Sequence, residues 1–484
     1  MMKKTNLKET LKQIVGVLLF GYVCIAEAVS TGCKKLRTLP KKVMALCVAA
    51  AIVVAMVPVA VFAVGTHTNH CICGKTHKVV GDHTAEQSVE WTAWDASASS
   101  NYQTTLPTSG TYYLTDNVTL SSQHTVNGKL TICLNGNTIS FTATTGSVIQ
   151  VPSGSTFELT DCSATAGQIT GGKGYTYSYF KASGGGVHND GTFTMYGGII
   201  AGNTAANGGG VYNAGTFTMY DGTIGGQTEN AKNCATIHGG GVYNYSGTFV
   251  MNGGTIIGNS ASSFGGGVCN YNDVTFTMTG GTITENMGAN GGGVYNSGTF
   301  TMENSTVSGN TAGSDGGGVY NYGTLKLAGN VKIKDNNKGN EGNLTPNNIF
   351  LTLDKRVTVA GALTCEDASI GVTMQNYNGG TFATGGAAYI GKFVSDSSRY
   401  GIAVDSDNLA LKFQYTVTFD YGTLGSETKT VFKDETVTPP TPVFAGKVLV
   451  GWYKDKWFYT EFNFSDANKD ESLNDSFVAM LSHL

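Results

Sequence analysis

Charged residues and proline are scarce in this chain. Only 13% of its 484 residues are Asp, Glu, Lys or Arg, and only 8 are proline, whereas 67 are glycine. Glycine weakens a helix by about 1 kcal/mol per residue relative to alanine, while Thr, Val, Tyr and Phe favour strands. This composition excludes a protein that is helical throughout and predicts an all-β fold.

The N-terminus has the pattern of an export signal. An uncharged apolar run covers residues 43–64 and follows the basic residues Lys34, Lys35, Arg37, Lys41 and Lys42. We expect cleavage after Ala63, which makes residues 1–63 a basic leader and signal peptide. The run is also long enough to cross a bilayer, so an uncleaved membrane anchor is the alternative. In both cases we expect the following residues to be secreted or held at the cell surface.

The exported part lacks both an excess of basic residues and an even number of cysteines. Cleavage after Ala63 leaves 21 basic and 32 acidic residues, a net charge of −11. An acidic chain repels phosphate backbones, so nucleic acid is not an expected partner. Seven cysteines remain, and an odd number argues against a full disulfide framework.

A repeat of about 25 residues dominates the middle of the chain. The phrase GGGV begins at Gly184, Gly208, Gly239, Gly265, Gly291 and Gly316. A coil of this length suits three short strands joined by tight turns, and such coils must stack because none buries its own apolar residues. We predict a parallel β-helix over residues 101–413, between a Cys/His-containing segment at 64–100 and a C-terminal module at 414–484.

Side-chain alternation assigns the faces of each strand. One inward row is predicted to contain Val187, Val211, Val242, Val268, Val294 and Val319. A second contains Phe193, Phe217, Phe249, Phe276, Phe300 and Leu325, and a third Ile200, Ile224, Ile256, Ile283 and Val307. We interpret two polar rows as structural: Asn189, Asn213, Asn244, Asn270, Asn296 and Asn321, then Asn203, Gln227, Asn259, Asn286, Asn310 and Asp335.

An outward position follows each repeat valine, and it is aromatic in most units. The residues there are His188, Tyr212, Tyr243, Cys269, Tyr295 and Tyr320. Tyrosine can stack on the apolar face of a sugar and also form a hydrogen bond. We therefore interpret Tyr212, Tyr243, Tyr295 and Tyr320 as an exposed ladder that binds glycans or other surfaces. The alternative is that tyrosine simply suits a half-buried strand.

The segment at 64–100 contains potential zinc ligands. His70, Cys71, Cys73 and His77 are residue types that bind Zn²⁺. The C-x-C spacing is tighter than that of standard zinc sites, and only one such pair is present. A polar stub without metal is the alternative, and no other cofactor is expected.

The repeats lack the grouped acids and bases of an enzyme. A glycosidase, for example, needs a carboxylate pair that flanks the sugar bond. Charged residues in the six clear repeats are scattered, and none recurs in register. The sequence favours a non-enzymatic protein, with an extracellular polysaccharide lyase or glycoside hydrolase as the alternative.

Two parts of the chain resemble known families. The phrase GGGVYNxGTFTMxGGTIxGN resembles the repeat of large surface proteins from gut Firmicutes, as do the segments HCICGKTHKVVGDHT and WTAW that precede it. The tail resembles the Listeria-Bacteroides repeat of internalin B-type surface proteins at Val417–Asp420, Pro442, Gly451–Tyr453 and Ser476–Ala479, but lacks its terminal Trp.

These resemblances imply a right-handed, pectin-lyase-like parallel β-helix and a small C-terminal β-grasp-like module. Together with the export signal, they lead us to expect a secreted or cell-surface structural and adhesive protein. Its expected partners are extracellular glycans or host and microbial surface proteins.

Overall fold

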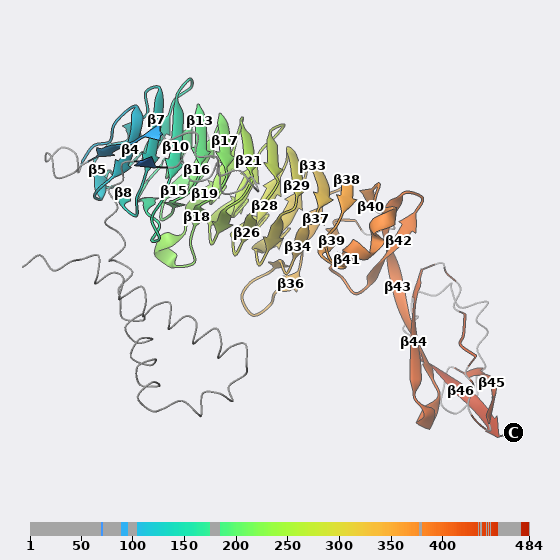
Figure 1. Cartoon of the computed structure of the whole chain (residues 1–484). Coiled ribbons are helices and arrows are strands. Elements are labelled where there is room, and N and C mark those ends of the chain that lie inside the picture. Colours follow the sequence, from blue (N-terminus) through green and yellow to red (C-terminus); the bar gives the residue numbers. More distant parts are fainter. Residues whose placement is uncertain are drawn as a thin grey trace, which may run out of the picture. The chain divides into compact units, whose positions relative to one another are not determined.

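The computed structural model describes residues 69–70, 89–94, 104–174, 184–376, 380–433, 435, 438–441, 443, 445, 447–453 and 476–483. All of them lie in one compact unit, Thr68–Leu484. Stacked parallel strands dominate this unit, which confirms the expected all-β parallel β-helix (Figure 1). No helix in the described part of the chain has the length and apolar character needed to span a membrane. The expected leader lies outside the described residues.

Four ladders of short strands build the β-helix. The first contains β3 (Thr92–Trp94), β4 (Gly110–Leu114), β7 (Lys129–Cys133), β10 (Thr156–Thr160), β13 (Thr192–Met195), β17 (Thr216–Met219), β21 (Thr248–Met251), β25 (Thr275–Met278), β29 (Thr299–Glu303), β33 (Thr324–Gly329), β38 (Val357–Leu363) and β40 (Thr381–Thr384). The second contains β5 (Val118–Leu120), β8 (Thr138–Phe141), β11 (Gln168–Thr170), β14 (Ile199–Ile200), β18 (Thr223–Gly225), β22 (Thr255–Ile257), β26 (Thr282–Thr284), β30 (Thr306–Ser308), β34 (Lys332–Lys334), β39 (Ile370–Met374) and β41 (Phe393–Ser395).

The third ladder carries the valines of the GGGV phrase. It contains β6 (His124–Thr125), β9 (Ile149–Val151), β12 (Val187–Asn189), β16 (Val211–Asn213), β20 (Val242–Asn244), β24 (Val268–Asn270), β28 (Val294–Asn296), β32 (Val319–Asn321) and β37 (Ile349–Leu351). The fourth contains β15 (Thr204–Asn207), β19 (Cys234–His238), β23 (Ser260–Phe264), β27 (Met287–Asn290), β31 (Thr311–Asp315), β35 (Asn337–Lys338) and the antiparallel β36 (Thr345–Pro346). The middle coils therefore have four strands each, one more than we expected from their length.

The predicted inward rows form the core. Every valine, phenylalanine and isoleucine in them is fully buried, as is the methionine two residues after each phenylalanine. Residues pair in register between coils, as Phe217 does with Phe249, so each coil adds one ring to a continuous stack. From Phe157 to Phe300 the ring centroids lie 4.6 to 5.4 Å apart, with interplanar angles of 13° or less. We call this stack the phenylalanine column.

Two hydrogen-bonded asparagine ladders accompany the core. In the first, the amide Nδ2 of each residue donates to Oδ1 of the next, from Asn189 to Asn321. The second contains Asn203, Asn233, Asn259, Asn286, Asn310, Asn336 and Asn348 and ends on Asp396. Burial raises the pKa of the terminal Asp396 carboxyl, although hydrogen bonds from Asn348 and Thr373 oppose the shift.

Two predicted members of the second ladder are wrong. Gln227 and Asp335 are exposed, and Asn233 and Asn336 occupy their places. Gln227 begins an insertion that contains the 3₁₀-helix η3 (Glu229–Ala231) and displaces the ladder residue along the chain. Asp335 precedes its ladder residue by one position and has a positive φ of 60°.

The GGGV turn lets the backbone pass close to the core. Gly265 has a φ of 67°, in the left-handed region that glycine enters without strain. A Cβ on Gly267 would lie 2.9 Å from the Ile283 side chain and 3.0 Å from the Asn286 amide. The repeated glycines are therefore structural.

An antiparallel hairpin follows the last coils. β42 (Tyr400–Asp405) pairs with β43 (Asn408–Asp420), which also pairs with β40, next to the 3₁₀-helix η4 (Ala387–Lys392). Unpaired end strands promote edge-to-edge association, and this hairpin covers the end of the first ladder.

The C-terminal half of β43 belongs to a second, mixed sheet. There β43 pairs with β44 (Ser426–Phe432) and β46 (Ser476–His483), and β46 pairs with β45 (Lys447–Tyr453), while η5 (Gly422–Leu424) links β43 to β44. Phe419 packs edge-on against Trp452, with ring centroids 4.8 Å apart. Near the N-terminus, β1 (Asn69–His70) pairs with β2 (Val89–Glu90).

Candidate functional site

The tyrosines that were predicted to form an exposed ladder point out of the core but are largely covered. Tyr212 and Tyr243 are only 3% and 5% exposed, so for these two residues the prediction is wrong. Tyr295 and Tyr320 are half-buried. Neighbouring coils contribute further aromatic side chains that pack over this inner aromatic row, which we define as His188, Tyr212, Tyr243, Tyr295, Tyr320 and Phe350.

The environment of the inner row disfavours ionisation of its phenols. Burial is the main cause that raises the pKa values of Tyr212, Tyr243 and Tyr320. Burial also raises the pKa of Tyr295 to about 12, and the neighbouring Cys269 thiol and the phenols of Tyr320, Tyr322 and Tyr271 add to the shift. These phenols are therefore neutral at physiological pH.

Part of the inner row stacks face to face. Phe264 lies against Tyr295, Tyr295 against Tyr320, and Tyr320 against Phe350, with ring centroids 4.3, 5.3 and 5.2 Å apart. Both faces of Tyr295 and Tyr320 are therefore covered by other rings. A sugar binds an aromatic side chain through the ring face, so these two rings offer a ligand mainly their edges and hydroxyls.

A second set of tyrosines forms the exposed surface, and sequence reasoning missed it. We define the outer aromatic row as Tyr245, Tyr271 and Tyr322, each of which directly follows the buried asparagine of its coil. Tyr245 and Tyr322 are 44% and 56% exposed, and Tyr271 is half-buried. The sequence pattern that could have revealed this row is the recurrence of Tyr directly after Val-x-Asn in three coils.

The outer row lies directly over the inner one. The Tyr245 ring lies 5.8 Å from that of Tyr212, 5.7 Å from that of Tyr243 and 5.8 Å from that of Tyr271. Tyr271 also meets Tyr243 edge-on at 5.8 Å. The two rows together form an aromatic surface along the third ladder, which we call the aromatic belt.

Cysteine replaces the aromatic residue of the inner row at one coil, and neighbours close the gap. Cys269 is fully buried, and burial raises the pKa of its thiol. Tyr271 packs against Tyr243 on one side of this position, and Phe264 packs against Tyr295 on the other. The inner row is therefore filled even where its ring is missing.

His238 and Phe264 extend the aromatic belt onto the fourth ladder. Their rings stack at 4.9 Å with an interplanar angle of 3°, and His238 also contacts Tyr243 at 5.8 Å. Burial lowers the pKa of His238 to about 4, so its ring is neutral at physiological pH. At this position histidine therefore acts as one more aromatic ring.

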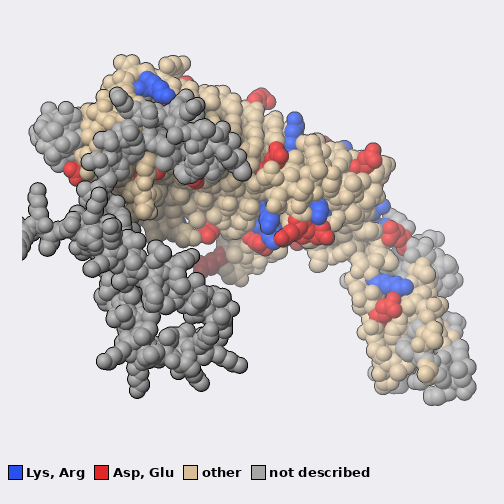
Figure 2. All heavy atoms as spheres, in the orientation of Figure 1, with Lys and Arg blue, Asp and Glu red and all other residues tan. Residues whose placement is uncertain are grey.

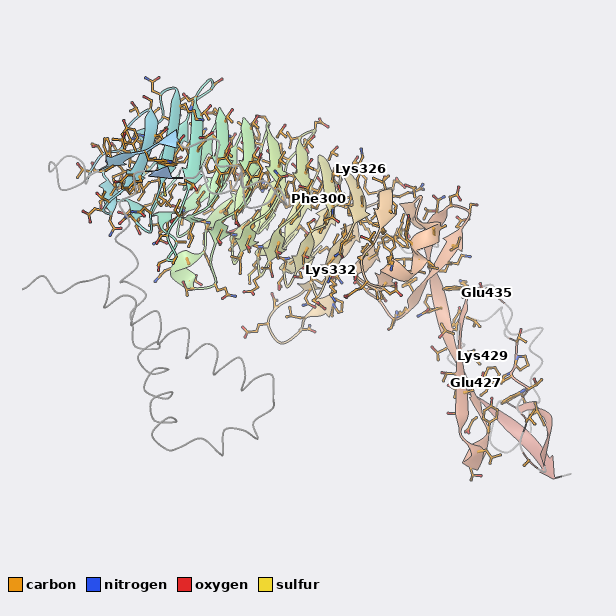
Figure 3. The ribbon with its side chains drawn as sticks, in the orientation of Figure 1. Phe300, Lys326, Lys332, Glu427, Lys429 and Glu435 are labelled. Atoms are coloured by element: carbon orange, nitrogen blue, oxygen red, sulfur yellow. The ribbon has the colours of Figure 1, made fainter. Side chains whose placement is uncertain are left out.

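Charged groups are sparse on the face of the β-helix that Figure 2 shows. Near the aromatic belt, His188 pairs with Asp190 at 3.1 Å and Lys338 with Asp315 at 2.7 Å. On the first ladder, Lys326 of β33 interrupts an outward row of threonines next to Thr301 (Figure 3). The Lys355 ammonium also lies close to the belt, 5.6 Å from the centroid of the Tyr322 ring.

The zinc prediction falls largely outside the described residues. Cys71, Cys73 and His77 are not described, and His70 is described only through its backbone in β1. In the described part of the chain, no three His, Cys, Asp or Glu side chains are close enough together to hold a metal ion. The zinc site therefore stays a prediction.

No family model matches the chain, and neither the curated proteins nor the solved structures contain a significant match.

Proposed function

We propose that this chain is a secreted or cell-surface structural and adhesive protein whose β-helix presents the aromatic belt to extracellular glycans. The observation that carries the proposal is the outer aromatic row, in which Tyr245 and Tyr322 expose about half of their surface on a rigid scaffold. Glycan sites commonly combine aromatic faces with a few hydrogen-bonding groups, and tyrosine supplies both.

The scaffold suits a binding surface that must keep its shape. The phenylalanine column and both asparagine ladders fix each coil against the next. Rigid placement lowers the entropy that side chains lose when a ligand binds. The repeat phrase also resembles that of bacterial surface proteins, and the N-terminal pattern of an export signal fits display outside the cell.

The proposal is tested on a glycan array with the purified full chain. The test variant is the double change Tyr245→Ala and Tyr322→Ala, and the matched control is Thr194→Ala with Thr218→Ala on the outward face of the first ladder. We expect the wild type and the control to bind the same glycans and the test variant to lose them. Equal binding by the test variant, or no glycan bound by the wild type, contradicts the proposal.

A further inference from the structure

The outer aromatic row has one interruption. Backbone hydrogen bonds place Tyr245, Tyr271, Ser297 and Tyr322 at the same position of four successive coils, since each N–H donates to the asparagine carbonyl of the coil before. Three of these residues are tyrosine and one is serine. Ser297 therefore stands where a ring would otherwise continue the row.

The two tyrosines beside Ser297 are Tyr271 and Tyr322, and each has another side chain packed on the side of its ring that is farther from Ser297. Tyr271 stacks on Tyr245 with an interplanar angle of 28°, and the Lys355 ammonium lies over the Tyr322 ring, 5.6 Å from its centroid. Tyr245 belongs to the coil before Tyr271, and Lys355 follows β37 of the coil after Tyr322. The remaining face of each ring is therefore on the side of Ser297.

The register sets the separation between these two faces. Tyr271 and Tyr322 are two coils apart, which corresponds to about 9.6 Å at the spacing of paired strands. In the described part of the chain, no ring contact joins Tyr271 to Tyr322. A further ring placed midway between Tyr271 and Tyr322 would therefore lie one strand spacing from each of them.

Polar groups lie beneath this position. Tyr295 lies two residues before Ser297 in the same coil, and both side chains are half-buried. The Ser297 hydroxyl donates to the Asn270 carbonyl at 3.3 Å, and its lone pairs can accept a hydrogen bond. This arrangement of two ring faces above neutral hydroxyls suits a ring that has apolar faces and a polar edge.

We propose that Tyr271 and Tyr322 hold a single pyranose ring of gluco configuration between them, over Ser297. In a β-linked glucose unit all hydroxyls are equatorial, so both faces of the ring carry axial C–H groups and can contact an aromatic face. The equatorial hydroxyls then point to the edge of the ring, toward Tyr295 and Ser297. This inference rests on the proposed function and adds the class of sugar that the belt recognises.

The stereochemistry gives a discriminating ligand. A galacto-configured ring has an axial oxygen at C4, which is a hydroxyl in the terminal ring and the glycosidic oxygen in a 4-substituted ring. This oxygen would face one of the two tyrosines without a hydrogen-bond partner. A site that leaves a polar group unpaired loses affinity. We expect the β-1,4-linked galactose trisaccharide to bind about tenfold more weakly than the β-1,4-linked glucose trisaccharide.

Isothermal titration of the full chain with both trisaccharides tests the inference. Ser297→Tyr supplies the missing ring from the protein itself, and we expect it to abolish binding of the glucose trisaccharide while the protein stays folded. The matched control is Ser246→Tyr, which adds the same side chain at an exposed serine whose hydroxyl, like that of Ser297, donates to a carbonyl of the preceding coil. Tyr322→Ala removes one wall and should weaken binding about tenfold.

The outcomes separate this inference from the proposed function. Loss of binding in Ser297→Tyr but not in Ser246→Tyr supports the inference. If Ser297→Tyr binds the glucose trisaccharide like the wild type, the ring is held elsewhere, and the inference is overturned while glycan binding stands. If the wild type binds other glycans on the array but neither trisaccharide, the inference is overturned without affecting the proposed function.

Discussion

The phenylalanine column and the outer aromatic row each place one residue per coil in register, but only the column is uninterrupted. Inside, each coil from Phe157 to Phe300 adds a fully buried ring. Outside, Ser297 interrupts the row between Tyr271 and Tyr322. A missing ring in the core would leave a cavity, whereas a missing ring at the surface costs little stability. An interruption in the outer row can therefore form a binding site without a large loss of stability.

The largest expected effect comes from breaking the column. Phe249→Ala removes a fully buried ring that stacks on Phe217 and Phe276. We expect the free energy of unfolding to fall by about 3 to 5 kcal/mol, from lost burial and the cavity left behind. Tyr245→Ala is the surface counterpart and should cost less than about 1 kcal/mol. Denaturant unfolding followed by circular dichroism measures both, and equal losses would contradict the comparison.

Breaking an asparagine ladder should have an intermediate effect. Asn286→Ala removes the Oδ1 that accepts from the N–H and Nδ2 of Asn259, and the Nδ2 that donates to Asn310. We expect a loss of about 2 to 3 kcal/mol, because buried groups of both neighbours lose their partners. The half-buried Asn252, which accepts from the Thr279 hydroxyl near the surface, is the control, and Asn252→Ala should cost well under 1 kcal/mol. The same unfolding measurement applies, and a neutral Asn286→Ala would show that the ladder is dispensable.

The smallest expected effect is a pH dependence at the edge of the belt. Burial lowers the pKa of His238 to about 4 from 6.5, so between these values the unfolded chain binds a proton that the folded chain does not. Stability should therefore decrease as the pH falls from about 6.5 to 4, by about 1 kcal/mol after allowance for solvent screening of the half-exposed ring.

His238→Phe keeps a ring against Phe264 and removes the titrating group. We expect this variant to lose that part of the pH dependence, as measured by unfolding midpoints at a series of pH values. If the stability of the variant depends on pH in the same way as that of the wild type, His238 does not cause this pH dependence.

The inward rows could be predicted because strand alternation alone decides which residues face the core. Val242, Phe249 and Ile256 illustrate this, since each is fully buried as expected. The ladder errors at Gln227 and Asp335 arose from an insertion and from an offset of one residue. The wider spacing between Gly208 and Gly239 indicates an insertion, but it does not show which residue of the longer coil takes the ladder position.

The covering of Tyr212 and Tyr243 could not be predicted from alternation. Strand alternation shows only whether a side chain points into or out of the core. It does not show which other side chains pack over that side chain. Tyr245 and Tyr271 come from turns after the strands, and Phe264 comes from the fourth ladder, which the sequence did not reveal. Their packing over the inner row depends on the lateral arrangement of neighbouring coils.

A crystal structure of the protein with the β-1,4-linked glucose trisaccharide tests the central claim most directly. We predict one pyranose ring between Tyr271 and Tyr322, with its hydroxyls directed toward Tyr295 and Ser297. A sugar bound on another face of the β-helix, or protein side chains that fill the position over Ser297, would contradict it.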